Sequence, residues 1–509
     1  MQGRLAAPLS YPDGNAALFL SACLALLVLA SRPDARAIER LTAAVAGVVL
    51  ADLAVLCQSR GSLVALACAL VVYLAVTRSR IRALAHLSIA VAAVAPAVPA
   101  LLHVYSTVIT GHGRNAAVTE AAAWISGSAA LAILGLIVVL LLERRVTFSD
   151  GVRAVVGWSS FAAIVAAVVA GAAIAVGPHP VARTDRAWHD FTTNKTAAPT
   201  TLHFAAGVGT SRYDVWRIAV RQFLAHPLIG VGADNYFVGY LRERRTHQIS
   251  RYPMSVELRT LSETGLVGAA LFLGFFALAF WRAIRTARRS QSPGLALACV
   301  AGCAYWLFHA SIDWFWELPA LTGAALALLA FASAPASTTA ARPSRGRSPL
   351  WPKVAAAGTA LLIAAVLAIP WASVSLVDAA VGRGAGRSAY SLLGTAARLN
   401  PLSEQPALSE ATLAASVGDR RRERRALLHA LRRSPHDWYP HFMLGIVAGR
   451  EHHPALARAE LERAHRLSPK DLVVVYAQRR LRWGRPLTEQ EVGRIFREVS
   501  STLRGVRQR

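Results

Sequence analysis

The sequence is poor in cysteine and poor in charge. Its five cysteines among 509 residues all fall inside apolar runs, where cysteine behaves as a small buried hydrophobic residue, so they predict no disulfide framework. Cys299 and Cys303 share a helix face by spacing, but no histidine or acidic cluster accompanies them, so no metal site is expected. Charged residues make up 17% of the chain and hydrophobic residues 54%. That balance excludes one soluble core and predicts a polytopic membrane protein.

Acidic residues are also scarce, with 29 Asp and Glu against 55 Lys and Arg, which leaves a net charge of +26. A surplus of this size raises the question of nucleic-acid binding. The basic residues, however, lie mainly in short connections between apolar runs and in the carboxy-terminal part of the chain. Basic residues beside membrane spans set the orientation of those spans, so we expect no nucleic-acid partner. A cleavable signal peptide is not evident either, because the opening MQGRLAAPLSYPDGNAA has no compact cationic region before the first apolar run.

Long apolar segments dominate the first three quarters of the chain. A helix needs roughly 17 to 25 apolar residues to cross a bilayer. Ten segments approach or reach this length and are predicted to be transmembrane helices, near residues 14–31, 38–57, 61–77, 83–105, 119–142, 154–176, 262–282, 294–311, 318–335 and 352–374.

The connections between these segments differ in charge. Five arginine-bearing connections are predicted to be cytoplasmic by the positive-inside rule: residues 32–40, 78–82, 143–153, 281–289 and 342–347. Alternation then places on the outer face the amino terminus, Arg60, a long loop at 177–258, the DWFWELP turn at 313–319 and the carboxy-terminal region. We therefore expect a multi-pass protein of the plasma or inner membrane whose long loop and carboxy-terminal domain are extracytoplasmic.

The carboxy-terminal region has a repeat. Three prolines recur at a spacing of 34 residues, and a small residue stands five positions before each of them: Pro401, Pro435 and Pro469, with Ala396, Ala430 and Ala464. This period resembles that of the tetratricopeptide repeat, in which each helical hairpin buries its face against its neighbours. A coincidental spacing in an Ala/Leu/Arg-rich helical tail is the alternative.

The predicted fold class is therefore all-α: a polytopic helical membrane protein followed by a short α-solenoid of tetratricopeptide-like hairpins. The predicted domains are amino-terminal transmembrane helices at 1–176, an extracytoplasmic loop with amphipathic helices at 177–258, further transmembrane helices at 259–375, and a helical repeat domain at 376–509.

Four motifs point to one family. They are QSRGSLVALA at 58–67, SRYDVWRIAVRQFLAHPLIGVGADNYF at 211–237, YPMSVELRTLSETGLVG at 252–268 and HASIDWFWELPAL at 309–321. Together they resemble the O-antigen ligase and polymerase-like superfamily of membrane glycosyltransferases, which includes lipopolysaccharide ligases, repeat-unit polymerases and protein O-oligosaccharyltransferases. The resemblance covers roughly residues 1–335. The opening RLAAPLSYPDGNAA looks like a mid-protein segment of longer relatives, so we expect those relatives to carry additional spans upstream.

The resemblance implies transfer of a glycan from a polyprenyl-diphosphate carrier to a glycan or protein hydroxyl on the outer face of the membrane, without a metal or cofactor. A diphosphate leaving group needs fixed positive charge, and arginine binds phosphate oxygens bidentately. Arg60 and Arg212 are the catalytic candidates for this role. Substrate contacts are expected from Arg217, Arg221, Trp216 and Asp313, although arginine and tryptophan at a span edge also serve as interfacial anchors.

The family's general base is replaced. Relatives carry a histidine, then Asn, Ser or Gln, nine residues, and Gly-x-x-Gly. Here Ser255 and the glycines Gly265 and Gly268 fit this pattern, but Met254 occupies the histidine position, and a thioether is no useful proton acceptor at neutral pH.

Three interpretations of Met254 stay open. Another group serves as the base, with His247 as the catalytic candidate and with His226, Glu257, Glu263 and Asp313 as alternatives. Alternatively, departure of the diphosphate is easy enough that no base is needed, since proton transfer contributes typically ~10²–10⁴-fold. The third possibility is a catalytically degenerate scaffold whose helical repeats bind partners in envelope assembly. In each case we expect a protein partner at the repeats.

Overall fold

The structure is a computed structural model that describes residues 3–145, 180–193, 212–290, 293–334 and 350–482, short pieces of 149–166, and residues 491 and 493. Throughout these residues the secondary structure is helical and contains no strand. The predicted all-α class is therefore confirmed for the described chain. Up to residue 334 the described helices are α1 (Pro12–Ala30), α2 (Ala37–Cys57), α3 (Arg60–Val76), α4 (Arg80–Val94), α5 (Val98–Thr110), α6 (Arg114–Arg145), α8 (Pro180–Thr193), α9 (Arg212–Ala225), α10 (Tyr236–Glu243), α11 (Val256–Arg289), α12 (Gly294–Ala310), the 3₁₀ turn η2 (Phe315–Glu317) and α13 (Pro319–Ser333).

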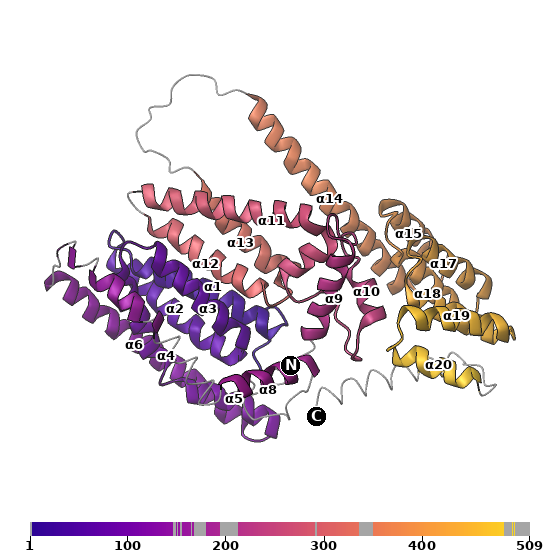
Figure 1. The fold of residues 1–509 in the computed structure, drawn as a ribbon, viewed down its shortest axis with the longest axis horizontal. Helices are drawn as coiled ribbons and strands as arrows, with labels where there is room; N and C mark the ends of the chain where they lie inside the picture. The colour runs from indigo at the N-terminus through magenta and orange to yellow at the C-terminus, as the bar shows by residue number, and fades with distance from the viewer. Residues whose placement is uncertain are drawn as a thin grey trace. The chain divides into compact units, whose positions relative to one another are not determined.

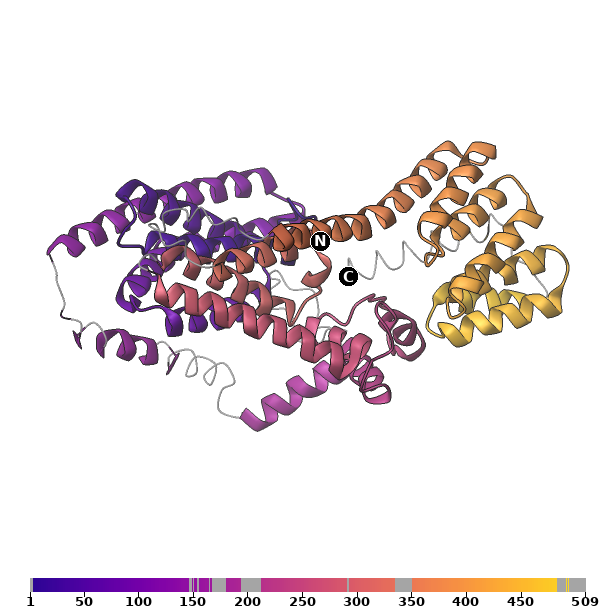
Figure 2. The same cartoon turned by 90° about the horizontal axis from the view of Figure 1, so that it is seen from above.

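The remaining helices begin with α14, whose part from residue 357 is apolar enough to cross a bilayer. They are α14 (Leu350–Arg383), α15 (Arg387–Leu399), α16 (Gln405–Ser416), α17 (Arg420–Arg433), α18 (Trp438–Arg450), α19 (Pro454–Leu467) and α20 (Leu472–Arg482). Figure 1 shows all these elements along the chain, and Figure 2 shows them from above.

The chain forms two compact units. The first contains residues 1–236 and 250–337, and the second contains residues 237–249 and 338–509. The loop predicted at 177–258 is thus divided, because its residues 237–249 group with the carboxy-terminal helices. The physical reason is a set of polar contacts from Arg244 and His247 to the turn before α20, which motif spacing cannot reveal.

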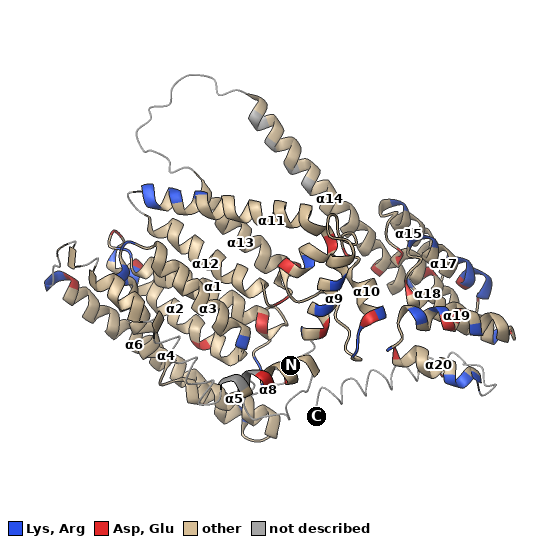
Figure 3. Ribbon diagram, viewed as in Figure 1, with Lys and Arg blue, Asp and Glu red and all other residues tan. Residues whose placement is uncertain are grey.

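The predicted membrane spans correspond to helices. Among the described residues, five helices are long and apolar enough to cross a bilayer: α1, α2, α6, α11 and the part of α14 from residue 357. The bent pair α4 and α5, at an angle of 47°, accounts for the predicted span at 83–105, and α3, α12 and α13 are shorter apolar helices. The predicted span at 154–176 lies largely outside the described residues. Figure 3 shows the long uncharged stretches of these helices.

The core of the first unit lies where α1 packs against α2, α3 and α12 (Figure 1). Small side chains fill these helix contacts, including Ala16, Ala17, Ala65, Ala301 and Cys303, each at most 2% exposed. Helices in a membrane associate through such small residues because the backbones can approach closely. This packing brings the amino-terminal ends of α1 and α3 to the carboxy-terminal end of α12, where the polar residues of the unit gather.

The second unit is a succession of short antiparallel helices, α15 to α20, each packed on the next (Figure 2). The three prolines spaced by 34 residues stand in the turns before α16, α18 and α20, and Ala396, Ala430 and Ala464 are fully buried. A Cβ on Gly445 of α18 would lie 2.8 Å from Leu461 Cγ of α19, so these two helices need a glycine at their contact. The tetratricopeptide assignment itself stays a prediction.

Candidate functional site

The Gly-x-x-Gly helix α11 is broken at its first glycine. Gly265 has φ +63° and ψ −162° and separates a short amino-terminal part from the long apolar part. The HPLIGVG segment that follows α9 forms backbone hydrogen bonds with the residues on both sides of this break. The N–H groups of Leu266 and Val267 donate to the carbonyl oxygens of Pro227 and Leu228, at 2.8 and 3.2 Å. These bonds satisfy donors that a helix start otherwise leaves unpaired.

The same segment completes the other side of the break. The N–H groups of Val231 and Gly232 donate to the carbonyl oxygens of Ser262 and Glu263, both at 2.9 Å. A Cβ on Gly230 would collide with the backbone of Glu263, and a Cβ on Gly265 would collide with the backbone of Leu228. The two motifs singled out in the sequence are therefore the two halves of one backbone interlock.

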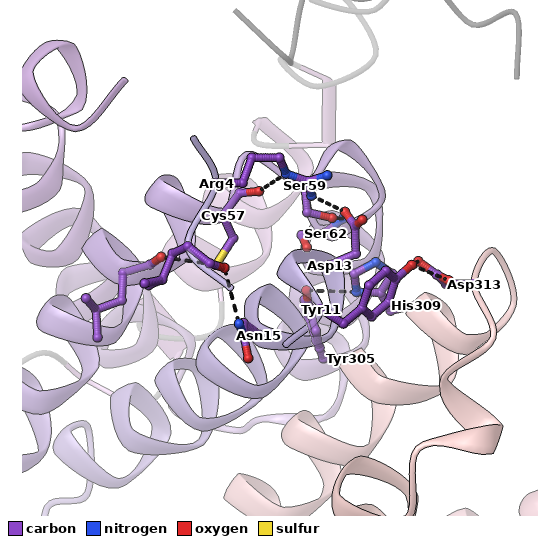
Figure 4. Close-up of polar contacts among 12 residues, drawn as sticks. Arg4, Tyr11, Asp13, Asn15, Cys57, Ser59, Ser62, Tyr305, His309 and Asp313 are labelled. Atoms are coloured by element: carbon purple, nitrogen blue, oxygen red, sulfur yellow. Dashed lines mark hydrogen bonds and ion pairs between the residues drawn. The ribbon is translucent and has the colours of Figure 1, made fainter. Parts of the chain in front are cut away.

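A polar cluster lies at the ends of α1, α3 and α12. The Tyr11 hydroxyl lies 2.9 Å from both carboxylate oxygens of Asp313, and the Trp314 N–H donates to Asp313 Oδ1 at 2.8 Å. Figure 4 shows Tyr11 and Asp313 together with His309, Asp13 and neighbouring residues. Asp313 is 2% exposed, so the tertiary structure encloses this carboxylate within the cluster.

The amino-terminal segment is tied to the same place by Arg4. Its guanidinium donates to the Cys57 carbonyl oxygen and to Asp13 Oδ1, at 2.7 Å each. Asp13 also accepts a hydrogen bond from Ser59, the residue that caps α3. Because Arg60 follows Ser59 directly, this network fixes the start of α3 and with it the backbone of Arg60.

The two arginines expected to bind diphosphate are brought together. Arg60 begins α3 and Arg212 begins α9, and each guanidinium lies within electrostatic range of the other. Arg212 also interacts electrostatically with His309 and Asp313. Segments separated by long stretches of sequence thus place two cations, one histidine and one carboxylate in one region of the first unit.

Burial changes the acidity of Asp313. Loss of solvent is the largest cause that raises the pKa of this carboxyl, and the nearby negative charge of Asp13 adds to it, whereas Arg212, the Trp314 N–H and the Tyr11 hydroxyl lower it. Together these effects raise the pKa to about 7. The Tyr11 phenol beside it has a pKa well above its usual value because of burial and the two carboxylates. Tyr11 therefore stays a hydrogen-bond donor, and Asp313 titrates near neutral pH.

His309 was not selected from the sequence. Its Nδ1 lies 3.2 Å from the Tyr305 hydroxyl, and a Cβ on Gly61 would lie 2.9 Å from its Nε2. The side chain is 1% exposed and packs edge-on against Phe315 at 4.4 Å. The sequence did contain one indication of its role, because His309 stands four residues before Asp313 in the same motif, HASIDWFWELPAL.

Met254 stands in an unusual conformation. Its φ of +53° lies in the left-handed region, which costs a residue with a side chain roughly 1–2 kcal/mol. On one side of it Tyr252 stacks on Trp314 at 6.4 Å between ring centroids. On the other side Glu257 accepts a hydrogen bond of 2.6 Å from Ser311. The segment around Met254 therefore packs on the turn that carries Asp313.

Glu263 and Glu257, two of the alternative bases, are held by other groups. Glu263 accepts a hydrogen bond of 3.1 Å from Arg259 Nε, and Arg259 also pairs with Glu317 and, at 3.7 Å, with Asp234. Glu257 accepts from both Ser255 and Ser311. Through Ser311 and Arg259, these carboxylates connect the first turns of α11 with the turn around η2.

The remaining loop candidates lie along α9 and beyond it. Arg217 pairs with the fully buried Asp214 at 2.8 Å, while Arg221 is exposed. Trp216 packs on Phe191 at 5.8 Å, and its buried indole N–H has no hydrogen-bond partner among the described residues.

The two loop histidines are placed elsewhere. His226 is exposed in the turn after α9. His247 belongs to the second unit, where its Nδ1 lies 3.0 Å from the Lys470 carbonyl oxygen. Neither of them belongs to the polar cluster, whereas His309 and Asp313 both interact electrostatically with Arg212.

Comparison with known proteins identifies this region. Residues 118–273 match the family model described as O-Antigen ligase. The match runs from α6 through the loop helices into the apolar part of α11, so it includes Arg212, Met254 and the interlocked motifs but not Arg60 or Asp313. No curated protein matches the chain. The superfamily resemblance drawn from the four motifs is confirmed.

Proposed function

We propose, because residues 118–273 match the O-Antigen ligase family model, that this chain transfers a polyprenyl-diphosphate-linked glycan to a hydroxyl acceptor on the outer face of the membrane. The acceptor is a sugar or a protein hydroxyl. The reaction breaks the bond between the anomeric carbon and the diphosphate oxygen, forms a new glycosidic bond, and leaves the carrier diphosphate with the bonding electrons.

The observation that carries the proposal is the approach of Arg60 and Arg212. Two guanidinium groups within electrostatic range repel each other, and an anion between them removes that cost. A diphosphate is well suited, because each arginine fork binds two phosphate oxygens and stays protonated throughout. Negative charge develops on the leaving group in the transition state, so fixed cations at this place lower the barrier.

Asp313 is the proposed general base. Its pKa of about 7 lies close to neutral pH. A base with such a pKa is largely ionised and still has a high affinity for the proton. The proton of the attacking hydroxyl passes to the carboxylate, and the Tyr11 hydrogen bond holds the carboxylate in place. His309 packs edge-on against Phe315 in the turn that carries Asp313, and it is a positioning residue in this scheme. His247 and Met254 have no part in the proton transfer.

The proposal is tested with Arg212→Ala in cells that make the polymer. Loss of one charge-assisted partner of the leaving group predicts a fall in transfer of about 10²–10³-fold, seen as loss of polymer on gels. Arg36→Ala is a matched control, because its side chain is exposed and pairs with Glu39 three residues along α2. Unchanged polymer length and amount in Arg212→Ala would contradict the assignment.

A second function rests on Met254. A methionine at the family's histidine position favours a non-catalytic scaffold that keeps the ligase body while its helical repeats bind partners in envelope assembly. Met254→His separates the two functions. Transfer that appears only in the histidine variant supports the scaffold, whereas transfer by the natural chain supports the enzyme.

A further inference from the structure

Residues 237–249 belong to the second unit, and the buried Arg244 attaches them to its helices. The Arg244 side chain is 1% exposed, with Nη2 3.2 Å from Ser468 Oγ and 3.8 Å from Asp471 Oδ2. His247 adds a contact of 3.0 Å from its Nδ1 to the Lys470 carbonyl oxygen. These contacts fix residues 237–249 to the turn between α19 and α20.

The second unit contains a cavity of about 390 Å³ in which this segment takes part. Its size lies within the range of about 300–1,000 Å³ found for small-molecule sites. Arg242 comes from the loop segment, and the other lining residues come from the helices α18 and α19 and the turn before α18: Pro435, His441, Arg463, Arg466 and Leu467.

The lining is strongly cationic. The buried Glu460 is already engaged, with Oε2 2.6 Å from His441 Nδ1 and Oε1 2.6 Å from Arg463 Nη1. Arg242 Nη2 lies 3.2 Å from His436 Nδ1. Among the described residues, Arg466 has no carboxylate partner. Three arginines thus line the cavity, and the carboxylate beside it pairs with one of them.

Such an arrangement favours an anionic ligand. Cations gathered in a cleft with partly apolar walls focus the electrostatic potential and raise the local concentration of anions. Guanidinium groups bind carboxylate and phosphate alike through two parallel hydrogen bonds. Leu467 and Pro435 add apolar surface, which suits a ligand that carries an acidic group on a small ring rather than a free ion.

We propose that this cavity binds an acidic sugar, through a carboxylate or a phosphate group, as part of the glycan that the protein handles. The proposal rests on the proposed function for the glycan nature of the ligand. Arg463 and Arg466 bind the acidic group, and Arg242 contributes from the segment 237–249 of the same unit. The second unit is thereby a substrate-binding unit.

The experiment uses the full-length protein in detergent micelles and isothermal titration at low salt. The probes are glucuronate, glucose 6-phosphate, glucose and inorganic phosphate. We expect saturable binding of at least one acidic sugar, no binding of glucose, and weaker binding of inorganic phosphate than of the acidic sugar. Loss of one charge-assisted contact in Arg466→Gln weakens the affinity by about tenfold or more.

Arg458→Gln is the matched control, since Arg458 lies exposed on the same helix and does not line the cavity. Arg466→Lys retains the charge and keeps part of the affinity, and circular dichroism checks that each variant is folded. Glucuronate binding alone assigns the carboxylate, and glucose 6-phosphate binding alone assigns the phosphate. Equal losses in Arg458→Gln and Arg466→Gln, binding of glucose, inorganic phosphate binding as tightly as the acidic sugars, or no binding at all would overturn the proposal.

The two proposals fail separately. Asp313→Asn is expected to lose transfer but to keep the affinity for the acidic sugar, because Asp313 belongs to the first unit. A natural chain that binds the sugar without any transfer contradicts the proposed function and leaves the cavity assignment standing. A chain that transfers glycan but binds no acidic sugar contradicts only the cavity assignment.

Discussion

Gly230 and Gly265 meet at a backbone contact in which neither position has room for a Cβ. Both have positive φ, +68° and +63°. The contact joins the segment after α9 to the break in α11, so it fixes the loop bearing Arg212 relative to the helix that follows Met254. Two short motifs that look independent in the sequence are one structural element.

Gly265→Ala is expected to destabilise this element. The added methyl group collides with the Leu228 backbone. The alanine must also keep the positive φ of this position, which costs about 1–3 kcal/mol of folding free energy. Thermal unfolding of the purified protein measures the loss. Gly274→Ala in the same helix is the control, because no atom lies within 4 Å of its Cβ position. A loss of equal size in both variants would contradict the interlock.

Asp313→Asn is expected to lower glycan transfer by about 10²–10⁴-fold, the usual contribution of a general base. In the natural chain, transfer should rise with pH as the carboxyl ionises and level off above its pKa of about 7. Tyr11→Phe removes a hydrogen bond that lowers this pKa, so its profile should move to higher pH. An in vitro transfer assay between pH 5 and 9 measures both effects.

The stability of the protein supplies an independent check on Asp313. Burial raises the pKa of this carboxyl in the folded state above its unfolded value. The associated stability is therefore fully present below the unfolded pKa, at about 4, and is lost as the pH rises through about 7. Asp313→Asn should lack this decline, seen as a flatter dependence of the melting temperature on pH. A pH profile of transfer identical in the natural chain and Tyr11→Phe would argue against Asp313 as the base.

Met254→Ala is expected to leave transfer largely intact, because the proposed proton acceptor is Asp313 and not residue 254. The measurement is polymer formation in cells lacking the natural gene, with Asp313→Asn as the inactive control. Met254→His in the Asp313→Asn background should recover part of the activity if the histidine position still faces the acceptor. A large loss in Met254→Ala would show instead that the methionine takes part in substrate binding.

Gly445→Ala should weaken the second unit. Its Cβ would lie 2.8 Å from Leu461 Cγ, and such overpacking costs typically about 1–3 kcal/mol. Limited proteolysis of the full chain reports the loss as faster cleavage within residues 387–482. Gly449→Ala, one turn further along α18 and with no atom within 4 Å of its Cβ position, should be neutral. Equal sensitivity of the two variants would show that the α18–α19 contact tolerates a larger residue.

Much of the fold follows from the sequence because membrane spans are local features. Length and apolar composition of one segment suffice to predict a span, and nine of the ten predicted segments correspond to described helices or to the bent pair α4 and α5. The family followed from motifs that are likewise local, such as HPLIGVG and ETGLVG. Arg60, Arg212 and Asp313 were selected individually by residue type and position.

The grouping of these residues was decided by the tertiary structure. Tyr11 and Asp313 are 302 positions apart, and their contact depends on how α1 packs against α12 through small residues, which no periodicity encodes. His309 entered the site for the same reason, while His247 was assigned to the second unit through its contact with Lys470. The sequence by itself determined the helices, the membrane and the resemblance to O-antigen ligases, since each depends on neighbouring residues. Only the tertiary structure decided which charges share one site, because that depends on the packing of distant helices.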